Sequence, residues 1–144
     1  MRSISWLFAR IRLRALGSRS DRDRIRRRAT WRRGERAVRW HLRMRGWRVL
    51  GQNVRVGSDE LDLVLVHPRA SIIAIVEVKA TRGGRPIADR VDEHKQRRIA
   101  RAAERLPRHW MYGRAMRFDV ATVRVGRWRC RVTHAPSAFA DPRR

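Results

Sequence analysis

The sequence predicts an α/β protein in which a mixed central β-sheet is flanked by α-helices. Three observations support this prediction. An amphipathic helical pattern precedes a block of short apolar strands, a second helical pattern follows them, and two alternating segments close the chain. The 144 residues, of which 42% are hydrophobic, can build one core but not two independent ones. We therefore expect an N-terminal extension over residues 1–30, one domain over residues 31–140 and a short tail over residues 141–144.

The first half of this domain is predicted as a helix followed by strands. Apolar residues recur at helical spacing between Trp31 and Arg45, and Gly46 follows as a helix terminator. Residues 47–50 and 54–56 are short extended segments, and a turn over residues 57–59 leads into a strand over residues 60–66. Residues 72–78 form a nearly unbroken apolar run, which is typical of a strand buried on both faces.

The second half is predicted as a helix followed by two strands. After a glycine-containing loop over residues 81–86, residues 88–106 form the clearest helical pattern, which Pro107 closes. Lys95 interrupts the apolar stripe of this helix. Residues 118–125 alternate as a strand, and Trp128, Cys130 and Val132 alternate with arginines as its half-exposed partner.

The charge balance predicts a polyanionic partner. Lys and Arg number 37 against 13 Asp and Glu, which gives a net charge of +24. Nucleic acid is the leading candidate, because neutralising phosphates releases condensed counterions, and an anionic membrane surface is the second. The single cysteine excludes an internal disulfide, no zinc-ligand spacing is present, and no apolar stretch is long enough for a transmembrane helix. We therefore expect a protein of the cytoplasm.

The N-terminal extension carries a net charge of +8, so the remainder keeps +16 and is basic in its own right. Ile4, Leu7, Phe8 and Ile11 lie at helical spacing among arginines. An amphipathic helix bound to a membrane or to nucleic acid, a targeting sequence and a frayed, disordered extension all fit this pattern. A membrane contact is expected only through residues 1–30.

Three polar residues on two predicted strands form the strongest chemical pattern. Glu77 and Lys79 leave the same face of one strand, and Asp62 lies on the preceding strand across a short turn. Leaving both acids ionised among apolar neighbours costs several kcal/mol unless a cation compensates them. Asp62, Glu77 and the backbone carbonyl of Val78 make an oxygen-rich set that suits Mg²⁺ or Mn²⁺. Lys79, one of only two lysines beside 35 arginines, would orient the attacking water and stabilise phosphate charge.

Each of these residues also has a simpler interpretation. Asp62 would cap a turn or pair with an arginine, and Glu77 with Lys79 would be a solvated pair at a strand end. Glu35 would reach the same site as a further metal or water ligand, or would be a first-turn acid favoured by the helix dipole. Lys95 would point toward the sheet to hold phosphate, or would extend into solvent.

Two further groups have mainly structural interpretations. Asp119 on an apolar strand is expected to form a structural salt bridge. The tryptophans could stack on bases, but packing in the core is favoured for most of them.

Several segments, in order, resemble one bacterial family, the YraN proteins of the restriction-endonuclease-like, PD-(D/E)XK superfamily. The resemblance covers about residues 31–139, and one departure is Asp59, where the family has glycine. It is carried by Gly34-Glu35, Gly46, Asn53-x-Arg55, Glu60-Leu61-Asp62, Val76-Glu77-Val78-Lys79, Val91-x-x-x-Lys95-x-x-Arg98-Ile99, Arg117-Phe118-Asp119-Val120, His134 and Ala138-Phe139.

The resemblance implies a restriction-endonuclease-like core and a Mg²⁺-dependent nuclease site at Asp62, Glu77 and Lys79, with Glu35 as the helix acid. It also implies DNA as substrate and points to branched or structured DNA. We expect the phosphate backbone to be held by Lys95, Arg98, Arg55 and Arg82. The alternative is a non-catalytic nucleic-acid-binding protein with the same fold.

Overall fold

The computed structural model describes residues 19–83 and 91–143. Two long elements come first, the helix α2 (Arg19–Arg43) and the strand β1 (Arg48–Val56). They are followed by β2 (Asp59–His67), β3 (Ile72–Arg82), α3 (Glu93–Glu104), α4 (Arg108–Met111), β4 (Ala115–Val125) and β5 (Cys130–Phe139). The order of helices and strands confirms the α/β class that the sequence predicts.

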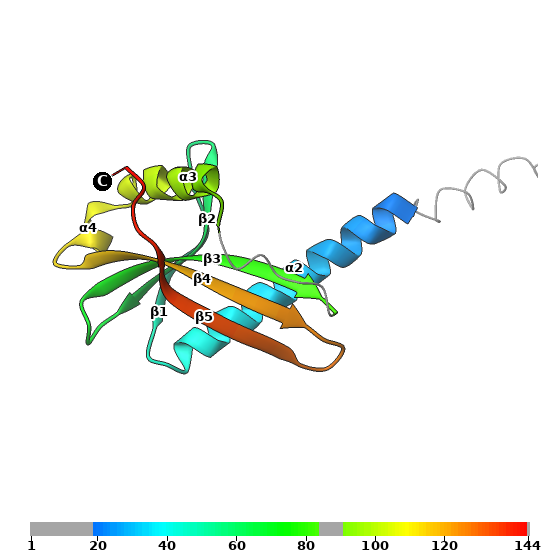
Figure 1. Ribbon diagram of the computed structural model, residues 1–144. Helices are drawn as coiled ribbons and strands as arrows, with labels where there is room; N and C mark the ends of the chain where they lie inside the picture. Colours follow the sequence, from blue (N-terminus) through cyan, green and yellow to red (C-terminus); the bar gives the residue numbers. More distant parts are fainter. Residues whose placement is uncertain (1–18, 84–90, 144) are drawn as a thin grey trace, which may run out of the picture.

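The five strands form one twisted mixed sheet in the order β1-β2-β3-β4-β5 (Figure 1). β3 and β4 are parallel, because α3 and α4 connect them, and the other neighbours are antiparallel. α2 crosses one face of the sheet and α3 covers the other face (Figure 1). This arrangement is consistent with a restriction-endonuclease-like core.

The core has two layers, one on each face of the sheet. On the α2 face, Val38 and Leu42 pack against side chains from the middle strands, all of them almost completely buried. On the α3 face, Ile99 and Leu106 pack against Ile75 and its neighbours. β3 contributes to both layers, which explains the unbroken apolar run in its sequence.

A glycine allows α2 to lie close to the sheet. A Cβ atom at Gly34 would lie 2.8 Å from the Ala80 Cβ and 2.9 Å from Val123 Cγ1. Such distances are shorter than van der Waals contact, so any side chain here would push the helix away from β3 and β4. The next residue is Glu35, and the close approach at Gly34 therefore sets the position of this acid.

Both outer strands of the sheet are irregular. The register of β1 shifts between Val49 and Gly51, and Asn53 further along has a φ of 49°. In β5 the chain contains Pro136, and Ser137 has a φ of 51°. Both φ values lie in the left-handed region, which L-residues other than glycine rarely adopt.

The structure differs from the sequence-based boundaries at several elements. α2 begins at Arg19 and not at Trp31, so it continues through the second part of the predicted extension. The extended segments at 47–50 and 54–56 are one strand, and β3 reaches Arg82 in the region predicted as a loop. α3 begins at Glu93 and is capped by the Asp92 side chain. The predicted amphipathic pattern from Ile4 to Ile11 and the predicted helix start at residue 88 lie outside the described residues.

The predicted salt bridge of Asp119 is confirmed. Its fully buried carboxylate accepts hydrogen bonds from Arg117 Nε and Nη2, both at 2.8 Å, and from the backbone N–H of Ser137 at 3.0 Å. His134 Nε2 lies 2.8 Å from the same carboxylate. Burial alone would raise the pKa of Asp119, but the hydrogen bonds from His134, Arg117 and Ser137 outweigh it and lower the pKa. This network ties β5 to β4.

Candidate active site

The candidate site lies where β2 and β3 separate. The pairing of these strands ends at Leu63 and Val76, whereas β3 continues along β4 to Arg82. Beyond that point the Val78 N–H has no partner strand on the β2 side, and it donates instead to Asp62 Oδ2 at 2.8 Å. The buried Asp62 side chain thereby satisfies a strand hydrogen bond and is held beside the β3 backbone.

Glu77 and Lys79 follow on the same strand, two residues apart and on one face. Glu77 is largely buried, with a side chain that is 12% exposed, and its Oε1 lies 3.3 Å from the Lys95 ammonium nitrogen. Lys95 therefore points toward the sheet and does not extend into solvent. The side chain of Lys79 is half-buried.

Asp62 and Glu77 form a pair of acids in a poorly solvated place. Burial and the neighbouring Glu77 carboxylate raise the pKa of Asp62 to about 7, although the Val78 N–H and the Lys95 charge oppose this shift. Glu35 also raises it, which places the α2 acid within electrostatic range of the pair. The carboxylate of Asp62 is therefore more costly to keep ionised here than in water.

Glu35 is buried on α2 and is 3% exposed. Burial raises the pKa of its carboxyl group, while hydrogen bonds from Asn53, Trp31 and Gln52 and the charge of Arg39 lower it. Its Oε1 atom has no hydrogen-bond partner in the structure. The interpretation of Glu35 as a first-turn acid is wrong, because α2 begins sixteen residues earlier and also contains Asp21 and Asp23.

The arrangement fits a divalent metal ion at Asp62 and Glu77. A buried carboxylate with a raised pKa, such as that of Asp62, gains from a cation, and Asp62 and Val78 are already adjacent through their hydrogen bond. Among the described residues, no three His, Cys, Asp or Glu side chains are gathered as a complete ligand set. Such an incomplete set suits Mg²⁺, which retains water and takes substrate oxygens as ligands.

An open groove of about 1190 Å³ runs along the neighbouring surface. It lies between the first half of α2, the β1–β2 hairpin and the end of β3. Its lining includes Asp23, Arg26, Arg27, Arg28, Thr30, Trp31, Arg32, Arg55, Glu60, Ala80, Thr81 and Arg82. Trp31 in this lining hydrogen-bonds Glu35, and Glu60 lies two residues from Asp62 on β2, so the groove lies next to the part of the site that α2 and β2 contribute.

The structure places the four predicted phosphate-binding residues in three different settings. Arg55 and Arg82 are exposed and line the groove. Lys95 contacts Glu77 at the candidate site. Arg98 donates from Nε to Asp59 Oδ1 at 2.7 Å and so joins α3 to the start of β2, and this contact holds the pKa of Asp59 below its usual value.

Sequence reasoning missed the polar surroundings of Glu35 and the arginines that α2 contributes to the groove. Asn53 and Gln52 belong to the irregular part of β1, where no periodic pattern marks the side that faces α2. Arg26, Arg27 and Arg28 lie in the segment that was separated as an extension. The signal that could have found them is the continuous run of helix-compatible residues from Arg19 to Trp31.

Comparison with known proteins identifies the family. The model described as "Uncharacterised protein family UPF0102" matches residues 34–123, which is more than half of the chain and includes Glu35, Asp62, Glu77 and Lys79. The chain belongs to the UPF0102 family.

Curated UPF0102 relatives are similar to this chain over most of their own length. A UPF0102 protein of Rhodopirellula baltica is 44% identical over 115 residues, which cover 75% of this chain and 68% of the relative. A UPF0102 protein of Rhizorhabdus wittichii is 40% identical over 67% of this chain and 79% of the relative. A UPF0102 protein of Methylobacterium nodulans is 39% identical over 79% and 88%, respectively. The family match begins at Gly34, so the arginine-rich first half of α2 lies before it.

The helices and tryptophans of this UPF0102 chain bear on two further expectations, a membrane contact and base stacking. Within residues 19–83 and 91–143, no helix is both long enough and apolar enough to span a membrane. Of the tryptophans, Trp31, Trp47 and Trp110 pack partly against the core, whereas Trp40 and Trp128 are exposed.

Proposed function

We propose that the protein is a metal-dependent nuclease that hydrolyses phosphodiester bonds in DNA. The observation that carries this proposal is a pair of acids, the buried Asp62 and the largely buried Glu77, with Lys79 two residues further along β3, whose end lines a basic groove. Burial and the Glu77 carboxylate keep the pKa of Asp62 raised despite the charge of Lys95, so a bound cation would favour its ionised form. The adjoining arginines supply the affinity for a phosphate backbone.

Asp62, Glu77 and the Val78 carbonyl would hold Mg²⁺ or Mn²⁺. When bound, the ion supplies Lewis-acid polarisation of the phosphoryl group and a lowered pKa for water. The hydrogen bond from the Val78 N–H holds Asp62 in place, and Lys95 holds Glu77. Lys79, on the same face as Glu77, would donate hydrogen bonds to the attacking water and to the phosphate, where negative charge increases.

Glu35 would act from α2, within electrostatic range of Asp62. Its Oε1 atom lacks a partner, so it is able to accept a hydrogen bond from water, and its carboxyl group is positioned by Asn53 and Trp31. Arg55 and Arg82 would bind phosphates on either side of the scissile bond, because both line the groove and are exposed.

The experiment compares cleavage of duplex, single-stranded, flapped and four-way-junction DNA, and of RNA, in Mg²⁺, Mn²⁺ or EDTA. Wild type is compared with Asp62→Asn and Lys79→Ala, and with Arg97→Ala as a matched surface control on α3. Cleavage that requires metal, persists in the control and falls at least about 100-fold in both site variants supports the proposal. The substrate that is cut fastest identifies the nucleic-acid structure that the protein prefers.

Two results would overturn the nuclease assignment. If Asp62→Asn and Lys79→Ala cut as fast as wild type, the activity belongs to a contaminant. If DNA is bound but never cut under any metal condition, the protein is a non-catalytic nucleic-acid-binding protein with an endonuclease-like fold.

A further inference from the structure

The first half of α2 extends beyond the sheet and is not packed against the core (Figure 1). The buried residues of this helix are Gly34, Glu35, Val38 and Leu42, all in its second half, and every side chain from Arg19 to Ala29 is exposed. A helical segment without a buried face gains little from packing, so hydrophobic burial does not explain why it is there.

Charge within this segment opposes its folding. Arg26, Arg27 and Arg28 are consecutive, and more arginines lie within one or two turns on either side. Like charges three or four residues apart on a helix destabilise it, and the ion pair of Arg24 with Asp21, at 3.8 Å and exposed, offsets little of this repulsion. Such a cluster of positively charged side chains is stabilised when a polyanion binds to it.

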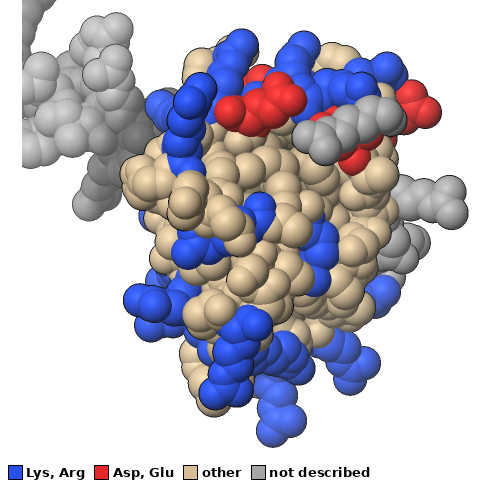
Figure 2. Space-filling view, turned by 90° about the vertical axis from the view of Figure 1, so that its left-hand side faces the viewer, with Lys and Arg blue, Asp and Glu red and all other residues tan. Residues whose placement is uncertain are grey.

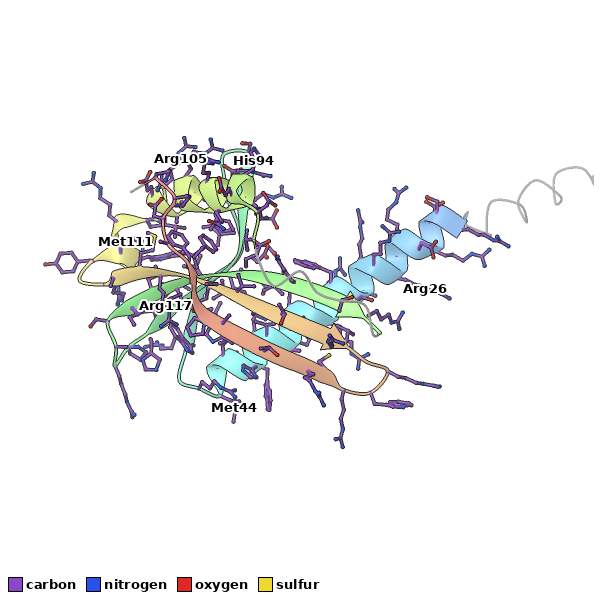
Figure 3. The ribbon with its side chains drawn as sticks, in the orientation of Figure 1. Arg26, Met44, His94, Arg105, Met111 and Arg117 are labelled. Atoms are coloured by element: carbon purple, nitrogen blue, oxygen red, sulfur yellow. The ribbon has the colours of Figure 1, made fainter. Side chains whose placement is uncertain are left out.

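The groove described above gives these cations a defined place. Its lining contains six arginines, four from α2 together with Arg55 and Arg82, against two acids, Asp23 and Glu60. Arg26 lies on the projecting half of the helix (Figure 3).

We infer that residues 26–32 of α2, the β1–β2 hairpin and the end of β3 form a clamp for a nucleic-acid backbone. This phosphate clamp leads to the candidate site through Glu35, because Trp31 in its lining hydrogen-bonds Glu35 and Glu35 lies within electrostatic range of Asp62. The inference rests on the proposed function for the identity of its ligand. It assigns to the segment that precedes the family match the task of holding phosphates beyond the cleavage site.

A nucleic acid fits this surface better than a lipid membrane. Membrane-bound amphipathic helices bury an apolar face, whereas Arg19–Thr30 offers only Ile25 and Ala29 as exposed apolar residues. Arginine guanidinium groups on both walls of a concave groove match a chain of phosphates. At the α4 end, arginines are dispersed around a largely uncharged surface, with acids at the edge where α3 lies (Figure 2).

The test measures binding in EDTA, so that it does not depend on cleavage. The clamp variant carries Arg26→Gln, Arg27→Gln and Arg28→Gln, which keeps good helix-forming residues. The control carries Arg48→Gln, Arg69→Gln and Arg108→Gln, three exposed arginines outside the groove with the same change in net charge. Fluorescence anisotropy with a labelled DNA strand and its duplex is recorded over a range of salt concentrations, and thermal unfolding establishes that both variants fold.

The clamp variant is expected to bind DNA at least about tenfold more weakly, with a salt slope that is smaller by about 2 to 3. The control is expected to lose much less affinity. Equal losses in both variants would overturn the inference, because bulk charge would then explain binding. Unchanged DNA binding with loss of binding to phosphatidylserine vesicles would also overturn it and would favour a membrane contact.

The two proposals fail in different ways. If wild type cuts DNA and the clamp variant binds and cuts as the control does, the clamp is wrong and the nuclease stands. If wild type never cuts but the clamp variant alone loses affinity, the clamp stands and the nuclease is wrong.

Discussion

The carboxylate of Asp62 takes the place of a strand partner for Val78, whose N–H it accepts at 2.8 Å. One side chain therefore closes the gap left where β2 turns away from β3, and it is also a proposed metal ligand. Because Asp62 has both roles, different substitutions at this position are expected to change stability and activity separately.

Asp62→Asn is expected to abolish cleavage and to be at least as stable as wild type. The amide oxygen still accepts the Val78 N–H, and the repulsion from Glu77 is removed. Asp62→Ala also abolishes cleavage but leaves a buried N–H unsatisfied, which costs about 1–3 kcal/mol. Urea unfolding distinguishes the two variants. Equal stability of Asn and Ala variants would show that the hydrogen bond contributes nothing.

Gly34→Ala is expected to destabilise the fold by about 1–3 kcal/mol, because its Cβ would overlap Ala80 and Val123. The shift of α2 would also displace Glu35, so DNA cleavage should fall by more than the change in the folded fraction. Ser20→Ala, at an exposed position of the same helix, is the control. Greater stability of Gly34→Ala, from its better helix propensity, would contradict the prediction.

Acid is expected to weaken the link between β4 and β5 through Asp119. The pKa of this carboxyl group is lowered in the folded state, so its contribution is complete above the ordinary Asp value of about 3.9. The contribution is lost as the pH falls through the lower, folded-state pKa. Asp119→Asn should therefore be about 3 kcal/mol less stable than wild type near neutral pH.

The difference between wild type and Asp119→Asn should shrink as the pH is lowered from about 5 toward 2. Urea midpoints of both proteins across this range measure it, and comparing the two cancels the general effect of high positive charge. A difference that stays constant with pH would mean that the charge of Asp119 does not matter.

Arg98→Gln and Arg55→Gln are expected to act differently. Arg98 holds Asp59 at 2.7 Å and links α3 to β2, so its loss should lower the unfolding midpoint. Arg55 is exposed and lines the groove, so its loss should weaken DNA binding without changing stability. Unfolding and binding are measured on both variants. If Arg98→Gln instead weakens DNA binding at unchanged stability, Arg98 is a phosphate contact.

The sequence predicted the order of elements and the two strands that carry the acids, because apolar periodicity marks segments that face a core. It did not predict the start of α2, since the exposed half of that helix has no apolar stripe. It also did not predict the extension of β3 to Arg82, because Thr81 and Arg82 are polar and a glycine pair follows them.

At the candidate site, the sequence suggested which acids would meet but not how they are held. The i, i+2 spacing places Glu77 and Lys79 on one face whatever the tertiary structure is. The hydrogen bond from Val78 to Asp62 and the contact of Lys95 with Glu77 arise from strand divergence and helix docking, which no local pattern encodes. The surroundings of Glu35 depend on an irregular strand for the same reason.

The irregular outer strands have a consequence for behaviour at high concentration. A regular edge strand offers a row of free N–H and C=O groups on which a second molecule can add its own strand. The shifted register and left-handed Asn53 in β1, and Pro136 with left-handed Ser137 in β5, interrupt that row on both sides of the sheet. Edge-to-edge growth into fibres is thereby opposed by backbone shape, independently of charge repulsion between the many arginines.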